Sequence, residues 1–345
     1  MSDLQGRQQC AVCGSNIIIK AETARDLPPG TMLSGRYLIG CALARGGFSI
    51  VYIVWDNEAN VRRAVKEFFP TDLASRDWGR NTVSAVSEDL AENWRQSLAL
   101  FLREARTLST LEQRNHVATG FVRVFDSFEE NNTAYLVMEY LEGCTLSQYL
   151  EKQPGKRIDW NLALALIQSV LAGAKVAHLH GIIHRDIAPD NIFLTHDGLV
   201  KLIHFGQAKE FVAGVTRSVA ISLRAGYSPS EQYQTRGNVG PWTDVYAAGA
   251  TLYKMVTGIL PPETPMRFEG AKLIPPNKLS SGIPVRAQKA MLKALALRAE
   301  DRYQGRRKGI RSEQLLAAEA GARATQVINP GIRVITIWIF EGVKQ

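Results

Sequence analysis

The stretch from Gly181 to Gly206 reads GIIHRDIAPDNIFLTHDGLVKLIHFG and carries two groups of polar residues. The first is His184-Arg185-Asp186, with Asn191 five residues after the aspartate. The second is a turn that reads His204-Phe205-Gly206. This spacing is specific only in combination with other motifs, so its meaning depends on the segments before and after it.

The composition describes an ordinary soluble globular protein, because 46% of its 345 residues are hydrophobic and 21% are charged. Such a chain is long enough for two lobes or one large domain, and the composition excludes a disordered or fibrous protein. The formal net charge of +8 would attract acidic partners, nucleic acid or an anionic membrane surface. No motif that reads nucleic acid accompanies this charge, so we do not expect specific nucleic-acid binding.

The cysteines and apolar segments indicate a cytoplasmic protein. Four cysteines, at positions 10, 13, 41 and 144, are too few and too scattered for a disulfide framework, and no secretory signal opens the chain. We therefore expect a reducing, cytoplasmic location. The longest strongly apolar run, Ile335–Phe340 with its neighbours, is far shorter than the roughly 20 residues that cross a bilayer, so no transmembrane helix is expected.

Residues 1–34 are expected to form a separate N-terminal segment. Within it, Cys10 and Cys13 have the spacing of a knuckle that presents two thiolates to zinc. Tetrahedral zinc needs four ligands, and the other two cysteines lie in the body of the chain, so this would be a partial zinc site completed between chains. The alternative is an exposed or vestigial thiol pair. Leu27-Pro-Pro-Gly30 then marks a linker.

A glycine-bearing turn, Ala44-Arg-Gly-Gly-Phe-Ser49, follows between two predicted strands. Gly46 and Gly47 carry no side chain, so their backbone amides can approach phosphate oxygens closely. On the pattern G-x-G-x-x-G, only the middle glycine is present, as Gly46, because alanine and serine replace the outer two. Alone, this turn is a weak indication of a phosphate-binding loop.

A lysine and a glutamate strengthen that indication. Lys66 comes at the end of a short apolar strand, where an inward-pointing lysine can pair with nucleotide phosphates and with a helix carboxylate. Glu104 is the candidate carboxylate, because the apolar residues at 101, 105 and 108 follow a helical period. A surface glutamate on an amphipathic helix is the alternative. The connection over residues 68–93 is expected to be a partly ordered insert.

Two further strands are predicted over 121–128 and 133–140, and helices over 146–153 and 160–180. The histidines at 178, 180 and 184 are not interpreted as a metal site. Those at 180 and 184 are separated by a glycine and two isoleucines, which should start a loop rather than continue one helix face.

The order of glycine turn, strand lysine, helix glutamate, His-Arg-Asp loop and x-Phe-Gly turn resembles the eukaryotic-like (Hanks-type) serine/threonine protein kinases of bacteria, over about residues 35–318. Downstream, Glu231 ends a segment that stands where these kinases carry Ala-Pro-Glu. By this resemblance Arg302 would pair with Glu231, and Asp244 would brace the catalytic loop from below.

The resemblance implies an α+β, two-lobed fold. A small β-rich N-lobe would cover about residues 35–140 and a larger, mainly helical C-lobe about residues 144–318, with a tail over 319–345. The tail carries the apolar run noted above.

The resemblance also implies roles for individual residues. Asp186 would be the catalytic base, Lys66 would bind phosphates while paired with Glu104, and Asn191 would be a metal ligand. ATP would be the nucleotide, with magnesium or manganese as its cation. The residues expected to bind ATP are Gly46, Gly47, Val51, Ala64, Lys66, Met138, Glu139, Leu141 and Phe193.

Two departures from the kinase pattern bear on activity. The aspartate that ligates magnesium in these kinases is replaced by His204, and imidazole suits zinc, copper or nickel rather than magnesium, so the site at Asn191 would be weak. The lysine two residues after the catalytic aspartate is replaced by Ala188. We therefore expect a degenerate kinase, a regulatory or signalling pseudokinase that retains its ATP-binding cleft but is impaired in phosphoryl transfer.

Two alternatives remain open. The chain would be an active serine/threonine kinase that uses Asp186 as base with an irregular metal site, or a scaffold that needs no nucleotide. Its partner would be a protein, as substrate or as binding partner. Basic residues of the C-lobe suit an acidic docking partner or a membrane surface, although a solvated helix face is the alternative; they are Arg298, Arg302, Arg306, Arg307, Lys308 and Arg311.

Overall fold

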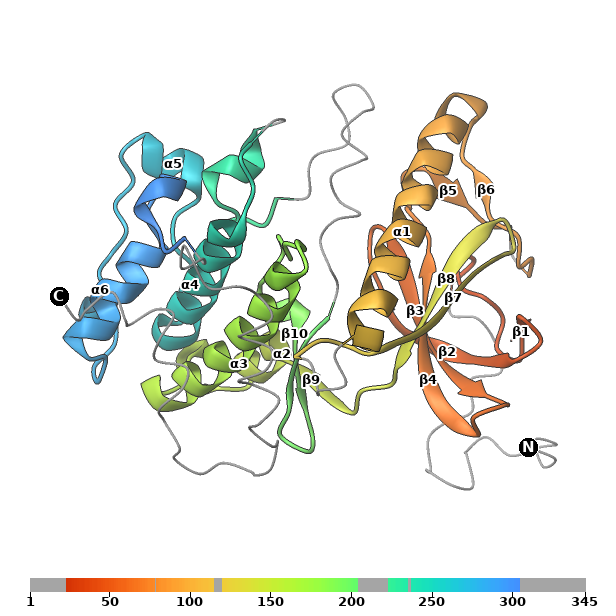
Figure 1. Ribbon diagram of the computed structural model, residues 1–345, viewed down its shortest axis with the longest axis horizontal. Coiled ribbons are helices and arrows are strands. Elements are labelled where there is room, and N and C mark those ends of the chain that lie inside the picture. Colours follow the sequence, from red (N-terminus) through yellow and green to blue (C-terminus); the bar gives the residue numbers. More distant parts are fainter. Residues whose placement is uncertain (1–22, 78, 115–119, 204–222, 235–236, 305–345) are drawn as a thin grey trace. The chain divides into compact units, whose positions relative to one another are not determined.

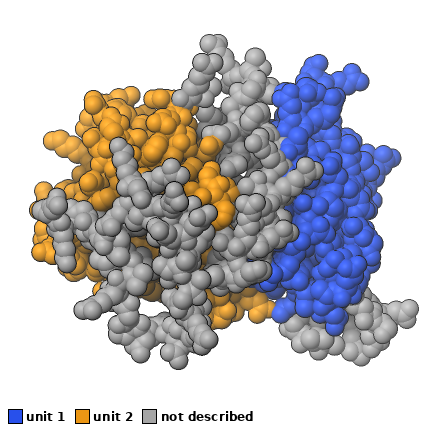
Figure 2. Space-filling view, viewed as in Figure 1, with its two compact units in different colours: residues 1–112, 123–141, 214–216 blue, residues 113–122, 142–213, 217–345 orange. Residues whose placement is uncertain are grey.

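The computed structural model describes residues 23–77, 79–114, 120–203, 223–234 and 237–304, without the side chains of residues 100 and 103–114. Within the chain there are two compact units (Figure 2). Unit 1 comprises residues 1–112, 123–141 and 214–216, and unit 2 comprises 113–122, 142–213 and 217–345. Strands dominate unit 1 and helices unit 2, which confirms the expected α+β fold.

Unit 1 is built on a six-stranded sheet with the strand order β1-β2-β3-β4-β8-β7, in which every neighbouring pair is antiparallel (Figure 1). The strands are β1 (Met32–Leu33), β2 (Tyr37–Arg45), β3 (Ser49–Asp56), β4 (Val61–Phe68), β7 (Val124–Glu130) and β8 (Thr133–Glu139). The predicted glycine turn lies between β2 and β3. Asn131 and Asn132 join β7 to β8 with φ angles of 52° and 59°, a left-handed conformation that asparagine tolerates.

The insert is shorter than predicted, because helix α1 already begins at Glu88 and continues to Arg114. The prediction placed only later apolar residues on this helix and assigned the segment up to Asn93 to a connection. Glu88 and Asp89 lie in the first turn of α1, where negative charge interacts favourably with the helix dipole. The remaining insert contains a small hairpin of β5 (Ala74–Ser75) and β6 (Ser84–Ala85).

A buried ion pair between Glu67 of β4 and Arg76 of the insert fastens this connection to the sheet, and both side chains are fully buried. The hydroxyls of Tyr52 and Tyr135 donate to the Glu67 carboxylate at 3.0 and 2.8 Å. Arg76 also donates to the backbone carbonyl of Arg25. The Glu67–Arg76 pair thus holds together β3, β8, the insert and the segment at Arg25.

Unit 2 contains a three-stranded sheet with the order β11-β10-β9 and a group of helices. The strands are β9 (Gly143–Thr145), β10 (Ile192–Thr195) and β11 (Val200–Leu202). The α-helices are α2 (Leu146–Glu151), α3 (Trp160–Leu179), α4 (Pro241–Thr257), α5 (Thr264–Phe268) and α6 (Val285–Ala294). Short 3-10 turns cover Pro154–Lys156, Pro189–Asn191, Ser230–Tyr233, Pro276–Lys278 and Ala299–Asp301.

Side chains cap the first turns of α2 and α3, and α3 and α6 pack against α4. Asp159 accepts hydrogen bonds from the amides of Asn161 and Leu162 at the start of α3, and Thr145 forms a capping box with Gln148 at the start of α2. Helix α4 is buried on all sides and packs against α3 and α6. It is the centre of this unit.

Among the described residues, one helix is long and apolar enough to cross a bilayer, namely α3, and 39% of its most apolar stretch is buried. Because its buried face packs against α4, the apolar character of α3 is that of a core helix. Several other predictions fall outside the described residues, namely the Cys10 and Cys13 pair, the His204 turn and the C-terminal tail. The predicted boundaries at residues 34 and 318 remain predictions.

Truncating Arg76 tests the buried ion pair. Arg76→Ala leaves the Glu67 carboxylate buried without its counter-charge, and the expected loss of unfolding free energy is about 3–5 kcal/mol, measured by urea denaturation of the full chain. The matched control is Arg80→Ala, since Arg80 is 73% exposed and pairs with an equally exposed Asp77, so its loss should stay below about 1 kcal/mol. Equal losses for the two variants would contradict this assignment.

Candidate functional site

The loop from His184 to Asn191 connects α3 to β10 in unit 2, and Asp244 of α4 holds it in place. The Asp244 carboxylate accepts hydrogen bonds from the backbone amides of His184 and Arg185, at 2.9 and 2.7 Å. It also lies 2.6 Å from Nε2 of His178. The prediction that Asp244 braces this loop is confirmed.

The brace fixes an unusual backbone, because Arg185 has a φ of 65°, in the left-handed region that arginine rarely adopts. Burial opposes the ionisation of Asp244, but the hydrogen bonds from His178 and the backbone outweigh it and lower the pKa of this carboxyl below its ordinary value. Asp244 is therefore an anion that three donors stabilise.

Asp186 and Asn191 lie in direct contact within this loop. Nδ2 of Asn191 donates to Oδ2 of Asp186 at 2.6 Å and to its backbone carbonyl at 2.8 Å. Both residues are buried, with exposed fractions of 7% and 2%. The sequence prediction that these two residues share one site is consistent with this geometry, although their catalytic roles stay predictions.

The same contact suits Asn191 to hold a hard cation. Since its Nδ2 makes both of these hydrogen bonds, the amide is oriented and its oxygen is not used by any described residue. A neutral amide oxygen is an appropriate ligand for magnesium or manganese, but one such oxygen makes a weak site. Among the described residues, no group of three histidine, cysteine or acidic side chains could hold a metal ion. A zinc site therefore has no support from this part of the chain, and Cys10 and Cys13 lie outside it.

Arg224 is a residue of this site that the sequence interpretation missed. Its Nε lies 2.7 Å from Oδ1 of Asp186, and its Nη1 lies 2.5 Å from Oδ2 of Asp190. Ala188 lies between these two aspartates in the sequence, and its side chain is fully buried and uncharged. In the sequence, Arg224 stands out only as a basic residue seven positions before Glu231, and nothing local to it indicates a contact with Asp186.

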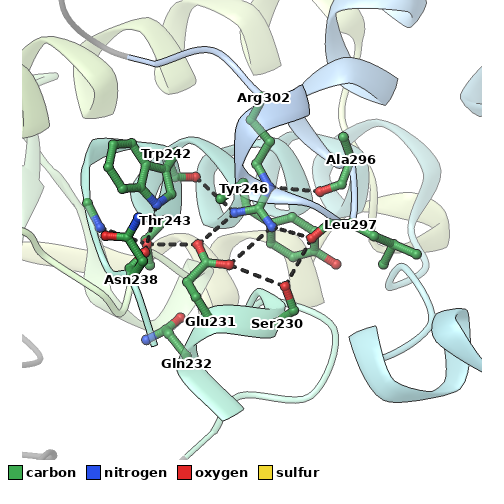
Figure 3. A network of polar contacts seen from close by, with 12 residues as sticks. Ser230, Glu231, Gln232, Asn238, Trp242, Thr243, Tyr246, Ala296, Leu297 and Arg302 are labelled. Atoms are coloured by element: carbon green, nitrogen blue, oxygen red, sulfur yellow. Dashed lines mark hydrogen bonds and ion pairs between the residues drawn. The ribbon is translucent and has the colours of Figure 1, made fainter. Parts of the chain in front are cut away.

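The segment that carries Arg224 is anchored by a second buried ion pair (Figure 3). Nη1 of Arg302 donates to Oε1 of Glu231 at 2.7 Å, and the same carboxylate oxygen accepts from Thr243 of α4 at 2.9 Å. Arg302 also donates to the carbonyls of Ala296 and Leu297, both at 2.7 Å. The predicted pairing of Arg302 with Glu231 is confirmed, and Arg302 is 2% exposed, so it is no part of an exposed basic face.

In unit 1, the register places four of the predicted nucleotide-binding residues on one face of the sheet. Val51 of β3 is the cross-strand partner of Lys66 in β4, and Ala64 is the partner of Met138 in β8. Cross-strand partners share a face of the sheet, and so do residues two apart in one strand. Because Ala64 and Lys66 are two apart in β4, both pairs lie on the same face. Glu67 projects from the opposite face into the buried ion pair described above.

The ammonium group of Lys66 lies 5.7 Å from the centre of the Phe101 ring in α1. Glu104 follows Phe101 by three residues in that helix, a spacing that places both on the same side of α1. The side chain of Glu104 is not among those described, so the predicted Lys66–Glu104 ion pair stays a prediction.

The glycine turn is fixed at both of its glycines. The amide of Gly46 donates to the carbonyl of Ser49 at 2.8 Å, and the carbonyl of Gly47 accepts from the amide of Thr71 at 2.8 Å. The β2 end of the turn is held by a two-bond ion pair between Arg45 and Asp26, each bond 2.9 Å long. The N-terminal segment and the insert therefore both hold this turn.

The remaining predicted nucleotide-binding residues are Glu139 and Leu141 in unit 1 and Phe193 in unit 2. Glu139 ends β8 and its amide donates to the carbonyl of Arg123 at 2.8 Å, while Leu141 ends the 123–141 segment of unit 1. Phe193 belongs to β10 of unit 2, paired with Thr145. The contacts of these residues with nucleotide stay predictions.

Asp244→Asn tests the brace through its pH dependence. The lowered pKa means that ionised Asp244 stabilises the fold above about pH 4, and that this contribution is lost as the pH falls below that value. Removing the charge should cost about 2 kcal/mol of unfolding free energy near neutrality. The difference from wild type should shrink below pH 4.

Urea denaturation between pH 7 and pH 3 measures this difference, with Asp197→Asn, in the exposed β10–β11 turn, as the control. If wild type and Asp244→Asn differ by the same unfolding free energy at every pH, the charge of Asp244 does not hold the loop.

Comparison with known proteins assigns the chain to a family. The family model described as the protein kinase domain matches residues 37–274. The chain is 32% identical to a probable serine/threonine-protein kinase of Clostridium acetobutylicum, over 80% of this chain and 39% of the relative. It is 31% identical to the serine/threonine-protein kinase PknL of Mycobacterium tuberculosis, over 75% of this chain and 58% of PknL. The chain thus spans less than two thirds of these relatives.

Solved structures agree with this assignment. A structure described as the apo form of PpkA-294 shares 31% sequence identity and has a TM-score of 0.72, covering 81% of this chain and 96% of that one. The kinase domain of Mycobacterium tuberculosis PknI, at 20% identity, has a TM-score of 0.60 over 86% of this chain and all of that one, which shows a shared fold. With its β-rich unit, its helical unit and its Asp244-braced loop, the chain has the protein kinase fold and belongs to the protein kinase family.

Proposed function

We propose that the chain is an ATP-binding homologue of bacterial serine/threonine protein kinases whose phosphoryl transfer to protein hydroxyls is slow. The contact between Asp186 and Asn191 carries this proposal, because the amide nitrogen of Asn191 donates to the Asp186 carboxylate, which orients both groups and leaves the amide oxygen for a cation. The replacement at His204 supports the second half, since it removes the acidic ligand that kinases use for magnesium.

In the proposed reaction, the hydroxyl oxygen of a serine or threonine attacks the γ-phosphorus of ATP. The bond from that phosphorus to the β,γ-bridging oxygen breaks, and ADP leaves with the electron pair. Asp186 accepts the hydroxyl proton, and Asn191 keeps the Asp186 carboxylate oriented toward the acceptor. A divalent cation, when bound, would neutralise charge on the phosphate oxygens.

The loss at position 204 accounts for the proposed low rate. Magnesium requires oxygen ligands in near-octahedral geometry, and a histidine nitrogen does not replace a carboxylate oxygen there. Asn191 and the phosphates of ATP would be left to hold the cation. Removing one group that stabilises transition-state charge typically lowers the rate about 10²–10³-fold.

The relatives named above are serine/threonine kinases, and we extend to this chain the substrate class that those names imply, a protein serine or threonine. We also propose a cytoplasmic location and a regulatory role in which nucleotide binding matters more than turnover. An acidic docking partner would meet basic residues such as Arg298 on the C-lobe.

His204→Asp tests the proposed function. If the missing carboxylate limits the rate, this variant should transfer phosphate from ATP to a generic acceptor such as casein about 10²–10³-fold faster than wild type, with magnesium or manganese present. Incorporation of radiolabelled γ-phosphate measures the rate, and calorimetry measures ATP binding to both proteins.

The matched control is Asp186→Asn in the His204→Asp background, which should return the rate to the wild-type level or below because the base is removed. The proposal is wrong if wild type already turns over as fast as His204→Asp. It is equally wrong if wild type binds no ATP with or without a divalent cation, a result that would favour a nucleotide-independent scaffold.

A further inference from the structure

We propose that Arg224 binds the γ-phosphoryl group of ATP beside Asp186 and so replaces the cation that is missing at Ala188. This inference rests on the proposed function, because it concerns the same site. It assigns the role to a residue that is distant in the sequence and lies outside the catalytic loop.

The position of the guanidinium is the first observation. Its Nε lies 2.7 Å from the carboxylate of Asp186, and its Nη1 lies 2.5 Å from that of Asp190, the residues that flank Ala188 at a distance of two on either side. A lysine at 188 would have brought its charge to this place. The positive charge is thus present although Ala188 carries none.

The unused donors of Arg224 are the second observation. Arginine has five N–H donors in a planar fork, and Nη2 contacts no other side chain or carbonyl in the described part of the chain. An exposed fraction of 28% leaves the side chain accessible. The fork suits a phosphate group, which accepts two parallel hydrogen bonds from one guanidinium.

The backbone around Arg224 is rigid, which is the third observation. The carbonyl of Arg224 accepts hydrogen bonds from the amides of Tyr227 and Ser228, and its own amide donates to Oγ of Ser228, all at 3.0 Å. Gly226 closes this turn with a φ of 77°, where a Cβ atom would also lie 2.8 Å from the carbonyl oxygen of Pro261. The guanidinium is therefore held before nucleotide arrives.

A second carboxylate partner of the guanidinium favours phosphate binding over a permanent block of Asp186. Asp190 anchors Nη1 independently of Asp186, so the guanidinium has a partner when Asp186 turns to the acceptor hydroxyl. If Asp186 were its only partner, the guanidinium would be left without a counter-charge when Asp186 turned to the acceptor hydroxyl.

The test compares affinities for ATP and ADP, since only ATP carries the γ-phosphoryl group. Calorimetry on the full chain uses ADP and an ATP analogue with a β,γ-imido bridge. Arg224→Gln should weaken the analogue about 10–100-fold while it leaves ADP nearly unchanged, because a charged hydrogen-bond donor to one phosphate is lost. Arg224→Lys, which keeps the charge, should lose less.

Two further variants sharpen the comparison. Ala188→Lys in the Arg224→Gln background should restore the preference for the analogue over ADP, because it returns a cation to the same carboxylates. Arg286→Gln is the matched control, since Arg286 is exposed on α6 and its loss should change neither affinity. Circular dichroism and thermal unfolding confirm that each variant is folded.

The outcomes separate this inference from the proposed function. Failure of wild type to bind either nucleotide overturns both. If wild type binds both nucleotides and Arg224→Gln weakens both equally, or weakens neither, then the proposed function stands and the role of Arg224 is overturned. Tighter binding of the analogue by Arg224→Gln would show that Arg224 blocks the site, and would also overturn the inference.

Discussion

The carboxylate of Asp244 makes the contacts on which the loop from His184 to Asn191 depends. Two of its three hydrogen bonds come from consecutive backbone amides, so it fixes the direction of the chain as well as its position. The left-handed backbone of Arg185 is strained, and such a conformation persists only where surrounding contacts over-determine it. Because Asp186 is the next residue, the direction of its carboxylate follows from this brace. A buried anion without catalytic chemistry of its own thus sets the geometry of the proposed base.

The N-terminal turn of α4 extends this constraint to a second segment. Thr243, which precedes Asp244, donates to Glu231, and Glu231 in turn pairs with Arg302. Adjacent residues of one buried helix therefore hold both the loop that carries Asp186 and the segment that carries Arg224. Arg224 and Asp186 are 38 positions apart in the sequence, and their side chains meet because the same turn of α4 holds both segments. Gln232 also links the two segments directly, since its Nε2 donates to the carbonyl of Arg185 at 2.8 Å.

The sequence predicted five of the six strands of the large sheet, helices α2 and α3, and the Arg302–Glu231 pair that the family resemblance supplies, because these follow from periodicity or from motifs with fixed spacing. It did not predict the contact of Arg224 with Asp186, since no local pattern reports which distant residue fills the space beside a small side chain. The buried Glu67–Arg76 pair was missed for a related reason. Glu67 alternates with Lys66 in β4, so only the register tells which of the two charged residues faces the interior.

The two departures at the site are unequal in physical terms. A missing positive charge can be supplied by any cation that reaches the same carboxylate, because Coulomb attraction depends on distance and only weakly on direction. Arg224 meets that condition at 2.7 Å although it comes from another segment. A magnesium ligand must instead offer an oxygen at about 2.1 Å along an octahedral axis, and no cation or nitrogen from elsewhere satisfies this. Of the two losses, the one at Ala188 is therefore open to compensation by the fold, whereas we propose that the one at His204 limits phosphoryl transfer.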